Sequence, residues 1–146
     1  MSNISIFVGT VYGNAQSVAE QAQSKLEALG HTVQLFDDPS VDDFKTAENV
    51  CFITSTTGQG DFPPNIEFFV GDLRDQMPMM EGKPFSVVAL GDSSYGDTFA
   101  QAGKEVFELL LELAGKPMSE MKVVDALETF NAEEEVLPWL ETVYKA

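Results

Sequence analysis

Cysteine, basic residues and long apolar runs are the scarce features of this 146-residue chain. Its one cysteine, Cys51, excludes an internal disulfide and any metal or iron–sulfur site that needs several cysteine ligands. The thiol lies in the apolar run 50–53, which favours a buried packing role. No apolar run approaches the roughly 20 residues of a membrane-spanning helix, and the first residues lack a signal-peptide pattern. These absences predict a cytoplasmic protein.

Acidic residues dominate the charge, because 24 aspartates and glutamates face eight lysines and arginines, for a net charge of −16. Such a surface repels nucleic acid and anionic membranes and attracts basic protein partners. Alternatively, the acidic residues serve only to keep the protein in solution. The net charge does not decide between partner attraction and solubility. The length suits a single domain over residues 1–146, and 44% hydrophobic residues are typical of a globular fold.

Short β-rich segments alternate with segments of helical periodicity along the chain. Strands are predicted at residues 4–8, 32–36, 49–54, 85–90 and 122–126. Helices are predicted at residues 18–29, 41–47, 66–76, 98–114 and 133–144. This alternation predicts an α/β fold with a doubly wound, five-stranded parallel sheet of order 2-1-3-4-5 and helices on both faces. Ligands bind such sheets beyond the carboxyl ends of the strands, so the loops there are the candidates for function.

The loop after the first predicted strand, residues 9–17, contains hydroxyl groups, amides and two glycines but no lysine or arginine. It leads into a helix, whose free N–H groups and dipole attract an anion. Neutral donors of this kind suit a single terminal phosphate. A triphosphate with Mg²⁺ would normally need a P-loop lysine, and neither that pattern nor G-x-G-x-x-G is present. Taken by itself, the loop could also be a plain helix start.

Two further loops carry residues that suit a flat ligand. Residues 54–64, after the third strand, place Gly58 and Gly60 behind four hydroxyl residues, and glycines let a backbone approach a planar ring closely. Loops of this length in a compact domain are often functional. Residues 91–99, after the fourth strand, place Tyr95 among glycines and small polar residues. An aromatic residue with so few apolar neighbours in the sequence is predicted to stack on a ligand.

In order and position, these loops resemble the phosphate loop, the T-G-x-G loop and the G-D-S-S-Y loop of the flavodoxin family. Residues 55–61 look most like the FMN domains of diflavin reductases. Residues 7–10, 54–61 and 90–95 look most like the short bacterial flavodoxins of the MioC/YqcA type. The resemblance covers essentially the whole chain. It implies a flavodoxin-like fold that binds FMN non-covalently and acts as an electron carrier, not as an enzyme.

The resemblance also implies which residues form the FMN site. The phosphate would be surrounded by Thr10, Val11, Tyr12, Gly13, Asn14 and Ala15. The isoalloxazine ring would be bordered by Ser55, Thr56, Thr57, Gly58, Gln59 and Gly60. Its other face would be held by Leu90, Gly91, Asp92, Ser94 and Tyr95, with Tyr95 stacked on the ring. Asp125 matches an acidic position near the ring, and Phe99 would pack beneath it.

Some positions depart from the family pattern. Thr57 stands where many flavodoxins carry a tryptophan. One face of the isoalloxazine ring would therefore be covered by backbone or left open to a partner. Asn14 stands where a threonine is common, which removes a hydroxyl donor but keeps an amide. Trp139, in the last predicted helix, is interpreted as a packing residue, and His31 as a surface residue.

The resemblance implies a monomer whose partners are basic redox proteins, such as an NADPH-dependent flavodoxin reductase and acceptor enzymes. A small FMN-dependent oxidoreductase of the quinone-reductase type is an alternative. An interaction protein that binds FMN weakly, or not at all, is another, because the middle loop lacks tryptophan. A phosphate-accepting receiver domain is rejected, since Gly9-Thr10 and Thr54-Ser55 stand where it needs acidic residues.

Overall fold

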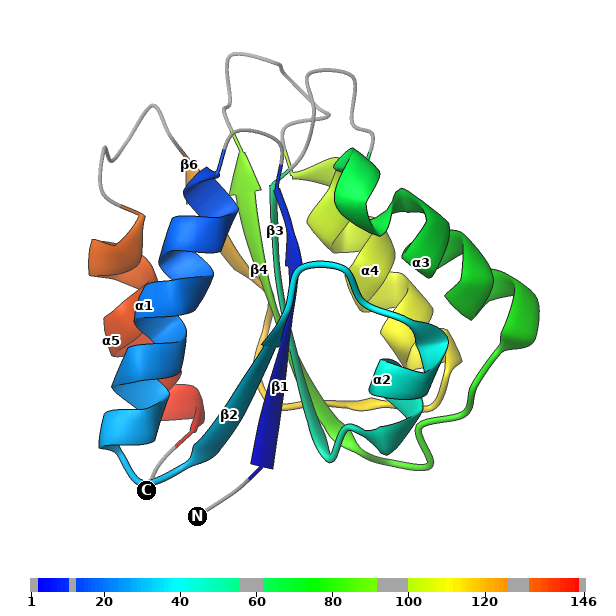
Figure 1. The fold of residues 1–146 in the computed structure, drawn as a ribbon, viewed down its shortest axis with the longest axis horizontal. Coiled ribbons are helices and arrows are strands. Elements are labelled where there is room, and N and C mark those ends of the chain that lie inside the picture. Colours follow the sequence, from blue (N-terminus) through cyan, green and yellow to red (C-terminus); the bar gives the residue numbers. More distant parts are fainter. Residues whose placement is uncertain (1–2, 11–12, 56–61, 92–99, 126–131, 145–146) are drawn as a thin grey trace.

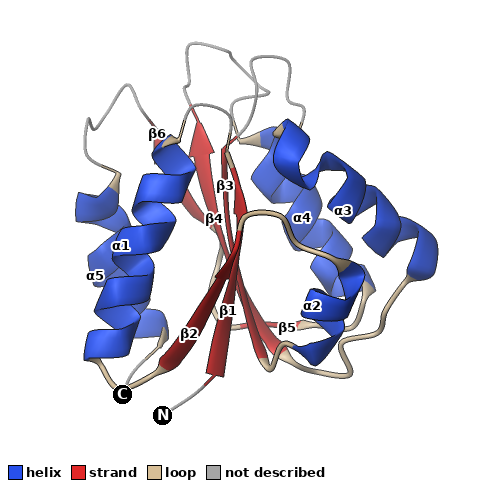
Figure 2. Ribbon diagram, viewed as in Figure 1, coloured by secondary structure: helices blue, strands red, loops and turns tan. Residues whose placement is uncertain are grey.

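A parallel sheet lies between two layers of helices in the computed structural model, which describes residues 3–10, 13–55, 62–91, 100–125 and 132–144 (Figure 1). The strands are β1 (Asn3–Gly9), β2 (Thr32–Phe36), β3 (Asn49–Ser55), β4 (Pro84–Gly91), β5 (Lys116–Pro117) and β6 (Lys122–Asp125). The helices are α1 (Asn14–Ala28), α2 (Val41–Thr46), α3 (Pro64–Gln76), α4 (Gln101–Glu112) and α5 (Glu133–Val143). Helices α1 and α5 cover one face of the sheet, and α2, α3 and α4 cover the other (Figure 2).

The strand order confirms the prediction from the sequence. The described strands run β2-β1-β3-β4, and β5 and β6 both pair with β4 in parallel. Strand β6 is the predicted fifth strand and pairs along residues 88–91 of β4. Strand β5 was not predicted, because a glycine followed by Lys116-Pro117 indicates only a helix end. It pairs with Pro84 and Phe85, at the beginning of β4.

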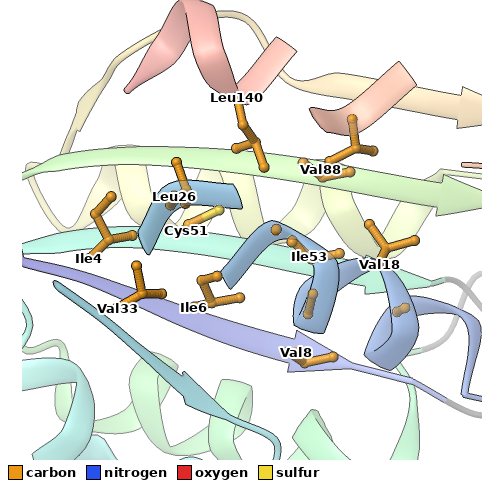
Figure 3. Close-up of a cluster of buried hydrophobic side chains, with 14 of the residues drawn as sticks. Ile4, Ile6, Val8, Val18, Leu26, Val33, Cys51, Ile53, Val88 and Leu140 are labelled. Atoms are coloured by element: carbon orange, nitrogen blue, oxygen red, sulfur yellow. The ribbon is translucent and has the colours of Figure 1, made fainter. Parts of the chain in front are cut away.

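The face of the sheet under α1 and α5 is packed mainly with aliphatic side chains (Figure 3). Ile4, Ile6 and Val8 point to this face because side chains alternate along a strand. Cys51 lies among them and is fully buried, which confirms its predicted packing role. Trp139 packs against the edge of this cluster and is half-buried, as the sequence predicted.

The opposite face, under α2, α3 and α4, is built around aromatic rings. Phe7 of β1 lies at the centre, with ring centroids 5.3 Å from both Phe36 and Phe52 and 5.5 Å from Phe69. Phe44 of α2 joins the same group at 6.0 Å. Because β1, β3 and β4 are covered on both faces, their sequences are nearly continuous apolar runs.

The prediction that His31 lies on the surface is wrong. The side chain is 5% exposed, and its Nε2 lies 3.1 Å from the backbone oxygen of Tyr144. Gly30, at φ 100°, ends the turn after α1 and directs the chain beneath the end of α5. The partner is 113 residues away, so no local pattern could have indicated this burial.

Helix boundaries agree with the prediction to within a few residues wherever they can be compared. Helix α3 begins at Pro64, two residues before the predicted start, because proline is well suited to the first position of a helix. In the described part of the chain, no helix combines the length and the apolar character needed to cross a membrane.

Candidate functional site

Several predicted site residues meet at the carboxyl edge of the sheet, the upper edge in Figure 1. Strand register aligns Gly9 with Thr54 and Ser55 with Leu90. It also aligns Gly91 with Asp125, at the ends of β4 and β6. The loops that follow β1, β3 and β4 therefore start from adjacent points, as the fold prediction required.

The turn from β1 into α1 is held by its own polar groups. The Gly13 N–H donates a hydrogen bond of 2.9 Å to Thr10 Oγ1. Gly13 has φ 87°, a left-handed conformation that favours glycine, and it stands at the N-cap of α1. A glycine N-cap offers no side-chain oxygen to the first N–H groups of the helix. The start of α1 is therefore suited to an external acceptor such as a phosphate oxygen.

The charge around this turn differs from that at most other helix starts. The first turns of α2, α3 and α5 contain acidic residues, whereas those of α1 and α4 contain none. In a chain with a net charge of −16, a neutral first turn keeps carboxylates away from a bound anion. The prediction of a phosphate loop with neutral donors is consistent with this arrangement.

Asn65, in the first turn of α3, is a site residue that the sequence analysis missed. Its Oδ1 accepts a hydrogen bond of 2.9 Å from the Thr10 N–H. Its Nδ2 donates to the backbone oxygen of Val8 at 2.7 Å and to that of Asp37 at 2.9 Å. One side chain thus joins the ends of β1 and β2 to the start of α3. The only signal in the sequence is an asparagine that follows the pair Pro63-Pro64.

A side-chain hydrogen bond also joins the ends of β1 and β3. Ser55 Oγ donates to the backbone oxygen of Gly9 at 3.3 Å, and Thr54 Oγ1 donates to the backbone oxygen of Ser55 at 2.9 Å. Gly9 leaves no room for a side chain, since an added Cβ would lie 2.5 Å from Ile66 Cδ1 and 2.5 Å from Thr54 Oγ1. This close packing explains the glycine at the end of β1.

Of the remaining predicted site residues, some are described by the structure and others lie outside the described ranges. Ala15 and Leu90 are buried in the core under α1 and α5, so they would meet a ligand through backbone groups. Gly91 and Asp125 are half-buried at the edge of the sheet. The other predicted positions lie outside the described residues: Val11, Tyr12, Thr56, Thr57, Gly58, Gln59, Gly60, Asp92, Ser94, Tyr95 and Phe99. The side chain of Asn14 lies outside the described part as well.

A doubly wound sheet with polar, glycine-containing turns at the carboxyl ends of β1 and β3 is the architecture of the flavodoxins, the standard example of ligand binding at a topological switch point. The chain belongs to this family, because the sequence profile of the flavodoxin family matches residues 6–139.

Individual relatives agree with the family match. The chain is 41% identical over 143 residues to Flavodoxin YqcA of Escherichia coli, a match covering 97% of this chain and 95% of the relative. It is 37% identical over 145 residues to the sulfite reductase [NADPH] flavoprotein alpha-component of Bacillus subtilis, a match covering 97% of this chain and 23% of the relative. A solved mutant of the flavodoxin from Pseudomonas aeruginosa superimposes with a TM-score of 0.91 at 40% identity, covering 96% of this chain and 95% of that one. The resemblance to short flavodoxins and to reductase flavoproteins is confirmed.

Proposed function

We propose that this protein binds FMN non-covalently at the carboxyl edge of the sheet and carries electrons between protein partners. Family membership implies this activity, and the neutral turn between β1 and α1 is the observation that carries the proposal for this chain. The proposal treats residues 1–146 as one FMN-binding domain. When bound, FMN supplies the redox chemistry, and the protein supplies binding, orientation and electrostatics.

The phosphate would be held by the turn between β1 and α1. Backbone N–H groups of Asn14 and Ala15 would meet its oxygens, together with the positive end of the α1 dipole, while Gly13 and Thr10 shape the turn through their own hydrogen bond. Asn65 holds the Thr10 N–H at 2.9 Å, so the start of this loop has its shape before the ligand arrives. A preformed loop loses less conformational freedom on binding, which favours affinity. Val11 and Tyr12 remain predicted members of the loop.

The ring would lie above the ends of β3 and β4. Ser55 and Gly91 end these strands, so the two loops that follow would enclose a flat ligand from both sides. Their ring-binding positions remain predictions: Thr56, Thr57, Gly58, Gln59, Gly60, Asp92, Ser94, Tyr95 and Phe99. Asp125, opposite Gly91 on β6, would place a carboxylate near the ring and oppose the accumulation of negative charge there.

Partners of this carrier would be basic redox proteins, such as an NADPH-dependent flavodoxin reductase and acceptor enzymes. The net charge of −16 supports this choice, as does the relative named as an NADPH-linked sulfite reductase flavoprotein. Association should therefore weaken as salt is added. Nothing in the described part of the chain favours an oxidoreductase with its own small substrate. A monomeric state and a cytoplasmic location stay predictions.

The purified protein tests the cofactor directly. We expect a yellow protein with flavin absorbance, and we expect chromatography of the denatured supernatant to identify FMN. A colourless protein that takes up no added FMN would contradict the proposal.

The carrier role needs a separate test. FMN-loaded protein mixed with NADPH and a quinone should show no turnover by itself, whereas an added NADPH-dependent flavodoxin reductase should reduce it rapidly. Turnover of NADPH and quinone without any reductase would instead indicate an enzyme.

A further inference from the structure

A groove of about 460 Å³ lies between the start of α2 and one side of α3. Asp38 and Asp42 line it from the α2 side, and Phe68 and Asp72 line it from α3. In Figure 1, the chain that joins β2 to α2 runs toward α2 below the start of α3. Residues of both segments line the groove. None of its lining residues belongs to the turn between β1 and α1, although Asn65 is among them.

Phe68 is the most exposed large apolar side chain among the described residues. It is 84% exposed, whereas the next residue, Phe69, is only 4% exposed and packs in the aromatic core. Phe68 and Asp72 are four residues apart, so they lie on the same side of α3. Single exposed apolar residues are common on protein surfaces. The case for a binding surface therefore depends on the carboxylates around this ring.

The carboxylates of the groove are not neutralised within the described part of the chain. Asp38, Asp42 and Asp72 are exposed and take part in none of its ion pairs, which join Lys25 to Glu141, Arg74 to Glu105 and Lys122 to Glu135. The described lining of the groove contains no lysine or arginine. Asp43 is different, because its carboxylate accepts the Ser40 N–H in a capping box. The groove thus combines an open aromatic ring with carboxylates that form no ion pair within the described residues.

We infer that this groove is a docking site for a basic segment of a protein partner, with an arginine laid against Phe68 between Asp42 and Asp72. The methylenes and planar guanidinium of arginine can stack on an aromatic ring while its N–H groups meet carboxylates. Lysine carries the same charge but has no planar group to stack. Charge complementarity and the exposed ring therefore favour arginine over lysine as the anchor.

The same helix already shows this chemistry on another side. The guanidinium of Arg74 lies 5.5 Å from the centroid of the Phe62 ring, and its Nη2 lies 3.5 Å from Glu105 Oε1. Arginine between a phenylalanine ring and a carboxylate is thus an arrangement that this surface forms within one chain. The groove offers the ring and the carboxylates, and the partner would supply the arginine.

The inference rests on the proposed function, because electron transfer is the reason for a partner to dock. The binding of a basic segment to the groove does not itself require flavin. Asn65 lines the groove and accepts a hydrogen bond from the N–H of Thr10, at the start of the proposed phosphate loop. A segment in the groove would therefore anchor a partner beside the FMN site.

Nuclear magnetic resonance of ¹⁵N-labelled, FMN-saturated protein tests the inference, with N-acetyl-hexaarginine amide as the probe. We expect shift changes concentrated on the backbone amides of residues 38, 40–42 and 65–76. We expect N-acetyl-hexalysine amide to bind more weakly at the same amides. A set of shift changes spread evenly over the acidic surface would overturn the inference, because it would show attraction to the net charge alone.

Variants separate the groove from the rest of the surface. Phe68→Ala should weaken hexaarginine binding about two- to fivefold, the range for a cation over an exposed ring. Leu111→Ala, which also removes an exposed apolar side chain but from α4, should leave binding unchanged. Asp72→Asn should weaken binding more than Glu112→Gln, which removes one negative charge from exposed α4 surface. Equal effects of the two charge variants, or no effect of Phe68→Ala, would overturn the inference.

Two further outcomes are also decisive. If the amide signals of residues 65–76 shift without peptide as the protein concentration is raised, the groove binds a second copy of the chain and the inference is wrong. If the protein binds no FMN, the titration is run on the flavin-free protein. Localised, Phe68-dependent binding would then support the docking site even though the proposed electron transfer had failed.

Discussion

The two ends of the sheet both use an asparagine side chain to hold backbone, but with different results. At the amino end, Asn49 Nδ2 donates a single hydrogen bond of 2.8 Å to the backbone oxygen of Asn3. That bond joins β1 and β3, which are already paired along their length. At the carboxyl end, Asn65 makes three bonds, to Thr10, Val8 and Asp37. These bonds lie beyond the last pair of the β1–β2 ladder, Phe7 with Phe36.

The difference shows where the structure needs extra support. Strand pairing fixes the amino end, so its side-chain bonds add only stability. Thr10, just after β1, has no such ladder, and it is held instead by Asn65 and by the hydrogen bond from the Gly13 N–H to its Oγ1. We therefore expect changes at the amino end to alter stability alone. Changes at the carboxyl end should alter stability and FMN affinity together.

Asn65→Asp should give the largest effect. Its carboxylate would face the carbonyl oxygens of Val8 and Asp37 without a proton to donate, and it would add a negative charge near the bound phosphate. We expect the free energy of unfolding to fall by about 3 kcal/mol, since unpaired and repelling polar groups cost about 1 to 3 kcal/mol each. FMN affinity should fall about tenfold or more. Urea denaturation and fluorescence titration measure the two quantities.

Asn49→Ala is the matched control for that variant. It removes one hydrogen bond to Asn3 at the opposite end of the same pair of strands. The free energy of unfolding should fall by only about 1 kcal/mol, with FMN affinity unchanged. A loss of FMN affinity in Asn49→Ala as large as that in Asn65→Asp would break the distinction between the two ends.

High pH should reveal a buried cluster in the amino half of the sheet. Burial raises the pKa of Cys51 from 9.0 to about 11, and it raises the pKa of Tyr144 well above its usual value. Above pH 9 the unfolded chain loses these protons while the folded protein keeps them. The free energy of unfolding should therefore fall by about 2 kcal/mol between pH 9 and 11 from Cys51 alone.

Urea denaturation from pH 8 to 11 measures this loss. Cys51→Ser keeps a small polar side chain that does not titrate in this range, so its stability should decline less steeply with pH. An unchanged slope in Cys51→Ser would show that the thiol does not contribute.

Tyr144→Phe tests the same cluster at neutral pH. The Tyr144 hydroxyl lies 2.6 Å from Ser86 Oγ in the buried region between the sheet and α5. Without it, the Ser86 hydroxyl loses that partner, and the free energy of unfolding should fall by about 1 to 2 kcal/mol. FMN affinity should stay the same, because the pair lies away from the carboxyl edge. A flavin-binding defect in this variant would contradict the comparison.

Gly13→Ala should have a small effect on stability, similar to that of Asn49→Ala. An added Cβ would meet nothing within 4 Å, so the cost comes only from the φ of 87°. That cost is about 1 kcal/mol for an L-residue. Asparagine tolerates this conformation better than alanine does. Gly13→Asn should therefore retain more stability and more FMN affinity than Gly13→Ala. The opposite order would show that the left-handed conformation at residue 13 does not account for these losses.

The sequence predicted the features that depend on local pattern. Apolar runs and helical periodicity indicated the long strands and the helices, and the order of the sheet followed from their alternation. The sequence did not predict Asn65, because its partners are 28 to 57 residues away. The burial of His31 was missed for the same reason, with Tyr144 at the far end of the chain. The exposure of Phe68 could not be distinguished from the burial of its neighbour Phe69 by composition alone.

The most direct test of the central claim compares FMN with riboflavin, which carries the same ring but no phosphate. Flavin-free protein would be titrated with each ligand, and quenching of flavin fluorescence would report binding. If the neutral turn between β1 and α1 is a phosphate site, FMN should bind at least about tenfold more tightly than riboflavin, and Asn65→Asp should reduce the difference. Equal affinities for FMN and riboflavin in the unmodified protein would contradict the account.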